Sequence, residues 1–286
     1  MDTFELCREA FERATWSYRR SLDDIEFDLS RRLLPERLCG QRLPEWLSPE
    51  ERRTLNHIRG FSYAHIFLFV EEFIIQQTCT AAMTYVQRDH DALAAMLRFS
   101  EEETKHQRMF GHMKDLLAEG LGFRPGELSG KEDVAQSVNS KSSFAVFLVT
   151  LVLEWLTQRH YVECFRPQET DLDPGFVRIF RLHWTEEAQH ARMDALQLRV
   201  LASAMDSDDI VSASEEFLEL LCAIRDLLEE QDALDIDSFE QAIGRSLKPE
   251  GRKALLIALN QEWLWTFLVS GLDHTAFQSV FHDLIP

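Results

Sequence analysis

Two stretches of this 286-residue chain decide its fold: EETKHQRM at residues 102–109 and EEAQHARM at residues 186–193. Both read Glu-Glu-x-x-His-x-Arg-Met. In an α-helix, residues three apart lie on the same face, so each stretch places a carboxylate beside an imidazole. One Glu-x-x-His is usually a solvated pair, but two copies in matched contexts predict two helices that present the same chemistry.

A second pair of segments also matches. VEEFIIQ occupies residues 70–76 and VLEWLTQ occupies residues 152–158. Their alignment sets Glu72 against Glu154, and each is followed by an aromatic residue and, four positions on, by a glutamine. The sequence therefore contains a degenerate duplication of one helical hairpin, with a glutamate inside the first helix of each copy.

Start and stop signals divide the central chain into four helices. Ser-Pro-Glu-Glu at residues 48–51 is a strong helix start. Short turns join the first helix to the second and the third to the fourth, so each pair predicts an antiparallel hairpin. The polar connection between the pairs is long enough to cross a bundle. The pattern predicts an all-α, ferritin-like four-helix bundle, with helices at about 49–88, 91–119, 143–166 and 174–205 and a crossover at 121–142.

The remaining segments are expected to pack on this bundle, residues 49–205. Apolar residues three and four apart predict helix within residues 2–34 of an N-terminal extension, 1–48. We expect residues 1–286 to form a single domain. Further helices are expected in the C-terminal part, 206–286, at about 208–231, 237–246, 249–271 and 273–283.

The charge balance narrows the function. With 30 Lys and Arg against 49 Asp and Glu, the net charge of −19 argues against binding to nucleic acid or to anionic membranes. The five cysteines form no Cys-x-x-Cys pair, and residues 1–9 are polar, which indicates a reduced, cytoplasmic protein without a signal peptide. The most apolar run, residues 144–156, is shorter than the roughly 20 residues of a membrane span.

Hairpin geometry brings the duplicated residues to one height. Glu154 and Glu187 lie equally far from their turn, and Glu72 and Glu103 do so within one or two residues. One Glu from each of two helices and a Glu-x-x-His from each of the other two is the ligand pattern of di-iron and di-manganese carboxylate proteins. Two cations would also remove the cost of burying these carboxylates. The predicted ligands are Glu72, Glu103, His106, Glu154, Glu187 and His190.

Three residues qualify this ligand set. Glu71 is an alternative to Glu72, which the duplication and the helix phase favour, and Glu163 is a weaker rival of Glu154. His183 lies four residues before Glu187 on the same face, where the other copy has Phe99. It is either a third imidazole on one metal or a core histidine bonded to a carbonyl.

With these residues the sequence resembles the p-aminobenzoate N-oxygenase family of ferritin-like di-iron oxygenases. The resemblance covers roughly residues 60–200 and rests on Glu, Glu-x-x-His, Glu and His-x-x-x-Glu-x-x-His on four helices. It implies two iron ions, with Mn/Fe as a second option, and O₂ as co-substrate. It also implies an external electron donor, either a reductase or a small reductant. The substrate would be a small molecule oxidised at an amine nitrogen or an aromatic ring, and a homodimer is compatible with this picture. Its implied ligands are Glu72, Glu103, His106, Glu154, His183, Glu187 and His190.

Three other functions compete. A ferritin- or rubrerythrin-like iron oxidase or peroxide scavenger should lack the extra histidine. A protein resembling the small subunit of ribonucleotide reductase needs a tyrosine near the metals, and Tyr161 is the candidate on the face of Glu154. A metal-free helical scaffold would bind no iron at all.

Overall fold

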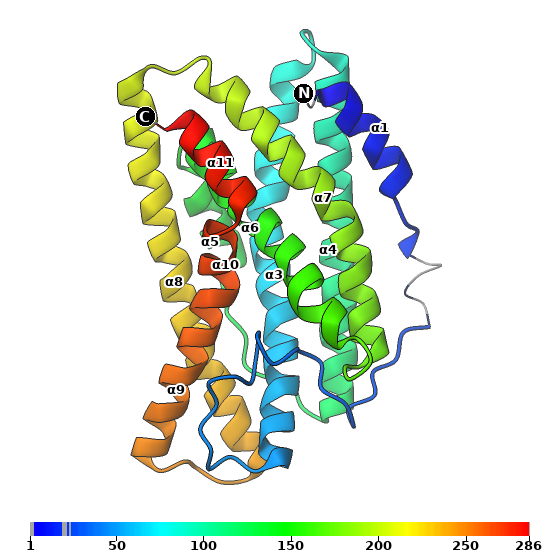
Figure 1. Ribbon diagram of the computed structural model, residues 1–286, viewed down its shortest axis with the longest axis vertical. Helices are drawn as coiled ribbons and strands as arrows, with labels where there is room; N and C mark the ends of the chain where they lie inside the picture. Colours follow the sequence, from blue (N-terminus) through cyan, green and yellow to red (C-terminus); the bar gives the residue numbers. More distant parts are fainter. Residues whose placement is uncertain (1–2, 19–21, 23, 286) are drawn as a thin grey trace.

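The computed structural model describes residues 3–18, 22 and 24–285. In these ranges the regular secondary structure is helical, apart from one isolated bridge between Arg32 and Leu172. Figure 1 shows four central helices with further helices on either side. The four are α3 (Pro49–Tyr85), α4 (His90–Leu121), α6 (Ser143–Arg159) and α7 (Pro174–Ala202).

The helix starts that the sequence predicts are present, whereas the second helix runs past Gly120, which was expected to close it. Ser48 and Glu51 form a reciprocal capping box at the start of α3, and the Asp173 side chain caps α7. Helix α4 begins at the Asp89 cap and ends at Gly122, whose φ of 76° is left-handed. Helix α3 packs along α4, and α6 packs along α7. The all-α, ferritin-like bundle of two hairpins is confirmed.

The crossover contains a helix that the sequence pattern did not predict. Helix α5 (Lys131–Asn139) lies between α4 and α6 in the chain and packs against α3. It is nine residues long and buries only Ala135 and Val138. Two buried positions are too few for a periodic signal, so the segment read as a polar loop.

Two helices continue into wider π-helical turns. After α6 the chain forms η1 (His160–Phe165) and the short 3-10 turn η2 (Arg166–Gln168). After α9 (Pro249–Leu264) it forms η3 (Trp265–Val269) and then α10 (Ser270–Leu272). Such π segments are often found at functional sites.

The N-terminal extension is less helical than expected. Helix α1 (Phe4–Ala14) ends where Thr15 becomes extended, and residues 24–47 form mainly turns. Tertiary bonds replace helical ones there: the Leu33 and Leu34 amides donate to the Asn56 side chain at 2.8 and 3.1 Å. Beyond Ala14, the described residues within 2–34 are helical only at positions 18 and 22, so the expected helix is wrong for residues 24–34.

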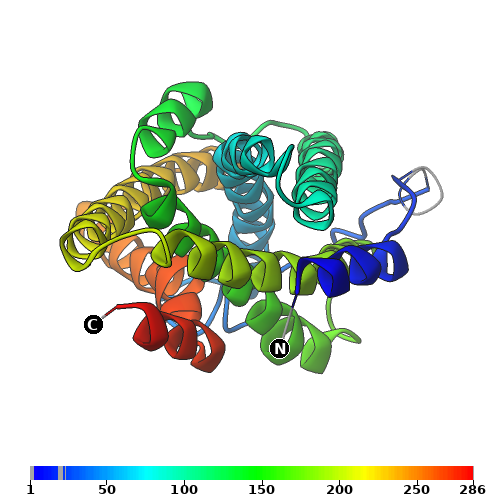
Figure 2. The ribbon, with the colours of Figure 1, turned by 90° about the horizontal axis from the view of Figure 1, so that it is seen from above.

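The C-terminal helices cover the side of the bundle opposite α1 (Figures 1 and 2). Helix α8 (Ser207–Ile243) is continuous, whereas two helices were expected. Its C-terminal third contains Asp232 and Asp235, which bind the buried Arg59 of α3 at 2.5 and 2.9 Å. The chain ends with α11 (Thr275–Leu284).

Two stretches, α3 and Pro249–Leu272, are long and apolar enough by composition to cross a membrane. In the folded chain 61% and 56% of the most apolar 18-residue segment of each stretch is buried, as in core helices. The single-domain organisation remains a prediction.

Candidate metal centre

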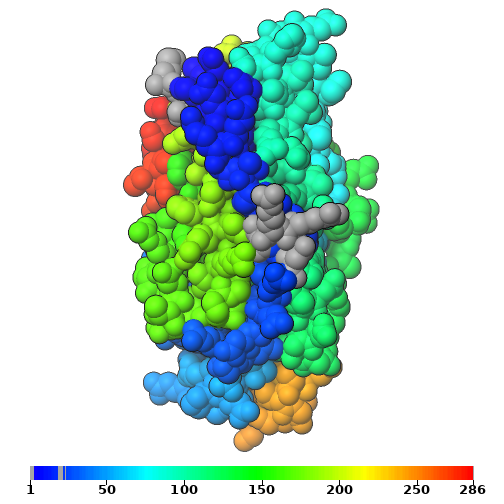
Figure 3. Space-filling view, turned by 90° about the vertical axis from the view of Figure 1, so that its right-hand side faces the viewer, coloured from blue at the N-terminus to red at the C-terminus, as the bar shows by residue number. Residues whose placement is uncertain are grey.

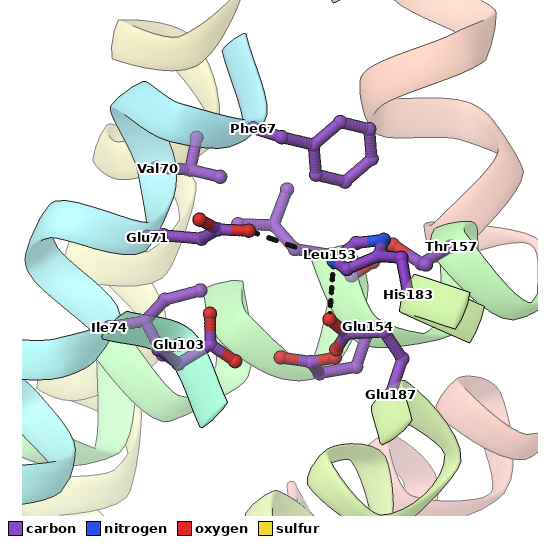
Figure 4. Close-up of a pocket in the computed structure, with 10 residues that line it drawn as sticks. All are labelled: Phe67, Val70, Glu71, Ile74, Glu103, Leu153, Glu154, Thr157, His183 and Glu187. Carbon is purple, nitrogen blue, oxygen red and sulfur yellow. Dashed lines mark hydrogen bonds and ion pairs between the residues drawn. The ribbon is translucent and has the colours of Figure 1, made fainter. Parts of the chain in front are cut away.

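Seven buried side chains converge in the middle of the bundle. Helix α3 supplies one, α4 two, α6 one and α7 three, and each residue is at most 3% exposed. Figure 4 shows five of them pointing toward one another across a small cavity. The seven are Glu71, Glu103, His106, Glu154, His183, Glu187 and His190.

One group forms around His190. Its Nδ1 lies 2.7 Å from Oε1 of Glu103 and 2.9 Å from Oε2 of Glu187. Glu154 Oε2 is 3.9 Å from the same nitrogen. His106 completes a set in which one ligand atom each from Glu103, His106, Glu187 and His190 lie within 4.8 Å of one another. This spacing suits a single metal ion.

A second group forms around His183. Its Nε2 is 2.5 Å from Glu187 Oε1 and 3.6 Å from Glu71 Oε1, and its ring lies 4.6 Å from that of His106. Ligand atoms of Glu71, His106 and His183 also lie within 4.8 Å of one another. The two groups share His106, so the cluster offers two adjacent positions for metal ions.

The choice of Glu72 needs correction, because the structure places Glu71 in the cluster instead. Glu72 Oε2 binds Lys131 and Gln107, each at 3.0 Å, and its side chain is 25% exposed. Glu72 shares a partly exposed stripe of α3 with Leu68 and Ile75. Because both neighbours are apolar, the sequence pattern does not indicate that this face of α3 points outward.

Two other expected positions lie outside the cluster. Glu163 is exposed and pairs with Arg37 and Arg159 at 3.1 and 3.0 Å. The Tyr161 hydroxyl accepts a hydrogen bond from Arg181 at 2.7 Å, and its ring stacks on Trp184. In the described contacts, neither reaches the seven residues.

The electrostatics of the cluster call for cations. Burial raises the pKa of Glu71 to about 8, and burial with the neighbouring Glu187 charge raises the pKa of Glu154 well above its usual range. Against the effect of burial, surrounding carboxylates raise the pKa of His106 and His190. Four carboxylates face three imidazoles, and both Glu71 oxygens lack a hydrogen-bond partner among the described residues. Two divalent cations would neutralise this surplus, so the residues fit a di-metal site.

An outer pair of carboxylates orients the histidines, and sequence reasoning missed it. His106 Nε2 lies 2.9 Å from Glu186, and His190 Nε2 lies 3.1 Å from Glu102. The first Glu of each Glu-Glu-x-x-His thus crosses to hold the histidine of the other copy. The doubled glutamate was the available signal, because ligating histidines usually donate their second nitrogen to a carboxylate.

The outer pair is itself paired with cations. Lys105 binds Glu186, and Arg98 Nε lies 3.3 Å from Glu102. On the same side, α1 lies across the seam between α4 and α7 (Figure 3), and its Phe11 ring lies 5.8 Å from that of His190. The backs of the histidines are therefore shielded from water.

This fold and this cluster define a ferritin-like di-metal oxidase or oxygenase. The sequence model of the p-aminobenzoate N-oxygenase family matches residues 14–235, and the chain belongs to this family. It is an oxidoreductase. No curated protein matches the chain in sequence.

Solved structures agree on the fold. An R2-like ligand-binding oxidase variant with a Mn/Fe cofactor is 14% identical, with a TM-score of 0.50 over 91% of this chain and 92% of that chain. A second variant, with an Fe/Fe cofactor, is 14% identical with a TM-score of 0.51 over the same shares. The neighbours carry two metals, and the cluster described above could hold two.

Proposed function

We propose that the protein is a non-haem di-iron oxygenase that uses O₂ to oxidise a small organic substrate, with Mn/Fe as the second metal option. The single observation that carries this proposal is the buried cluster of four carboxylates and three imidazoles. Two bound irons would supply O₂ activation. An external reductant would supply the electrons.

The chain's own residues prepare this site. Glu71, Glu154 and Glu187 would neutralise the metals, and Glu102 and Glu186 keep His106 and His190 in one orientation. In each histidine Nε2–H donates outward, which leaves Nδ1 free to face the metals. Burial excludes bulk water from the ligands.

The wall of the cavity favours an uncharged, largely apolar substrate. Phe67, Val70, Ile74 and Leu153 line the cavity together with the carboxylates (Figure 4). The described lining includes no lysine or arginine, and the carboxylates can accept N–H groups. An aromatic amine therefore suits the cavity better than an anion does.

The space is small in this structure. It measures about 10 Å³, room for one water-sized molecule. A substrate ring must therefore displace side chains of the apolar wall when it binds. Phe67 is the largest group on that wall.

The test begins with metal. Purified protein is loaded anaerobically with Fe(II), and bound iron is measured by elemental analysis. The reduced protein is then exposed to ¹⁸O₂ with a panel of arylamines and simple aromatics, and products are read by mass spectrometry. We expect bound iron and ¹⁸O in an amine or ring product.

A matched variant controls for adventitious iron. Glu103→Gln keeps the shape of a central ligand but removes its charge, so it should bind less iron and give no labelled product. Equal iron and equal product in this variant would overturn the proposal.

A further inference from the structure

A buried tyrosine–histidine pair lies next to the metal cluster. The Tyr63 hydroxyl of α3 is 2.6 Å from His160 Nδ1 in η1, and His160 Nε2 is 3.0 Å from the Ser270 hydroxyl at the start of α10. Tyr63 and His160 are each 1% exposed, and Ser270 is fully buried. Both π-helical segments thus adjoin one polar network inside an apolar core.

The network fixes the direction of its protons. Ser270 donates its hydroxyl hydrogen to the Thr266 carbonyl at 2.7 Å, so it must accept from His160 Nε2–H. His160 Nδ1 then carries a lone pair, and Tyr63 donates to it. Burial lowers the pKa of His160 to about 3 and raises that of Tyr63 well above its usual range, so both groups are neutral at rest.

Aromatic rings connect this pair to the cluster. The Tyr63 ring centroid is 5.0 Å from that of Phe67, which is 5.2 Å from that of His183. Phe180 forms a second bridge, 5.0 Å from Tyr63 and 6.4 Å from His183. Tyr63 is therefore separated from a candidate ligand by a single layer of rings.

Two other buried tyrosines, Tyr85 and Tyr161, lack this combination. Tyr85 donates to the Gln197 amide oxygen at 2.6 Å, which is not a base, and Tyr161 accepts from the Arg181 cation. A phenol can give up an electron at moderate potential only if its proton leaves at the same time. Tyr63 has an acceptor for that proton, and its burial keeps water from serving instead.

We propose that Tyr63 is a redox-active tyrosine, which supplies one electron to the metal centre after that centre has been oxidised by O₂ without a substrate. The proposal rests on the proposed function, which provides the oxidant. The Tyr63 O–H bond breaks, one electron reduces the metal centre, and the proton forms an N–H bond at His160 Nδ1. The products are a neutral tyrosyl radical and an imidazolium that still donates to Ser270. Such a step would spare the ligands from oxidation.

The experiment detects the radical directly. Fe(II)-loaded protein is mixed with O₂ in the absence of substrate, frozen, and studied by EPR. We expect an organic radical signal whose hyperfine pattern narrows when the protein contains ring-deuterated tyrosine. Tyr63→Phe should lose the signal, whereas Tyr85→Phe, another buried and hydrogen-bonded tyrosine, should keep it. His160→Gln, which cannot take the proton, should also lose it while binding iron normally.

A second design avoids dependence on the folding of Tyr63→Phe. The sequence contains four tyrosines, so replacing Tyr18, Tyr85 and Tyr161 by Phe leaves Tyr63 alone. This triple variant should retain the radical. Protein that binds iron and consumes O₂ but gives no tyrosyl signal, or a signal that survives in Tyr63→Phe, would overturn this inference only. Failure to bind iron or consume O₂ would overturn the proposed function and this inference together.

Discussion

Helix phase distinguishes two adjacent glutamates of α3. Glu71 is 2% exposed and points into the cluster, whereas Glu72 binds Lys131 on the outer side. We predict that Glu71→Gln lowers bound iron by about half, because one of the two metal positions loses its charged ligand. Elemental analysis after anaerobic loading measures this. Glu72→Gln is the matched control and should bind as much iron as the unaltered chain; a loss of iron only in Glu72→Gln would reverse the correction.

The outer carboxylates act at the same scale. We predict that Glu186→Gln lowers metal affinity by about 10–100-fold, because the charged acceptor that fixes the His106 ring becomes a weaker, neutral amide oxygen. Competition with a chelator measures the affinity. Glu101→Gln is the control, since Glu101 is exposed and pairs with Arg98 at the surface. Equal affinity of the two variants would show that the Glu186 contact does not orient the ligand.

At the scale of elements, α10 packs closely on α6. A Cβ on Gly271 would collide with the backbone carbonyl of Val152, two residues before Glu154. We predict that Gly271→Ala destabilises the protein by about 1–3 kcal/mol or more, because neither backbone can yield easily. Urea denaturation gives the free energy of unfolding. Unchanged stability would mean that the two helices can separate without cost.

Gly111 in α4 provides the opposite case. A Cβ there would meet only Leu68 Cδ1, at 3.7 Å, an ordinary contact. Gly111→Ala should therefore stabilise the protein by about 0.5–1 kcal/mol through lower helix entropy cost. The same urea measurement tests it, and destabilisation would contradict the expected free space.

At the scale of the whole molecule, we expect acid to lower the stability of the folded chain where α3, α4 and the crossover meet. His65 Nδ1 accepts from Lys114 at 2.8 Å, its Nε2 donates to the Leu128 carbonyl at 3.1 Å, and Glu127 pairs with Lys114. Burial and the Lys114 charge lower the pKa of His65 to about 4. Between about pH 6.5 and 4 the unfolded chain binds a proton that the folded chain refuses. The contribution of neutral His65 to the free energy of unfolding is therefore complete above about pH 6.5 and is lost as the pH falls toward 4.

The loss amounts to at most about 3 kcal/mol. Urea denaturation of metal-free protein near pH 7 and near pH 5 measures it. We predict a smaller difference between the two pH values in His65→Gln than in the unaltered chain. His90→Gln, at an exposed position, is the control and should behave like the unaltered chain. Equal differences in all three proteins would refute the assignment.

The sequence predicted the bundle because its signals are local. Ser48 and Asp173 cap helices through neighbouring backbone groups, and Glu103 and His106 share a face by spacing alone. Glu71 could not be identified in this way, since apolar Leu68 and Ile75 do not reveal which side of α3 faces inward. Residues 24–47 likewise adopt turns because of distant partners such as Asn56, which no local pattern encodes.

Glu102 contacts His190 of the second hairpin, and Glu186 contacts His106 of the first. Each hairpin therefore supplies the carboxylate that orients a histidine of the other. Neither copy of the repeat forms a complete half-site by itself, so the two copies depend on each other. We expect chain fragments divided near Gly130 to bind iron only after mixing, with neither fragment binding it alone. Iron bound by a single fragment would show that one hairpin is sufficient.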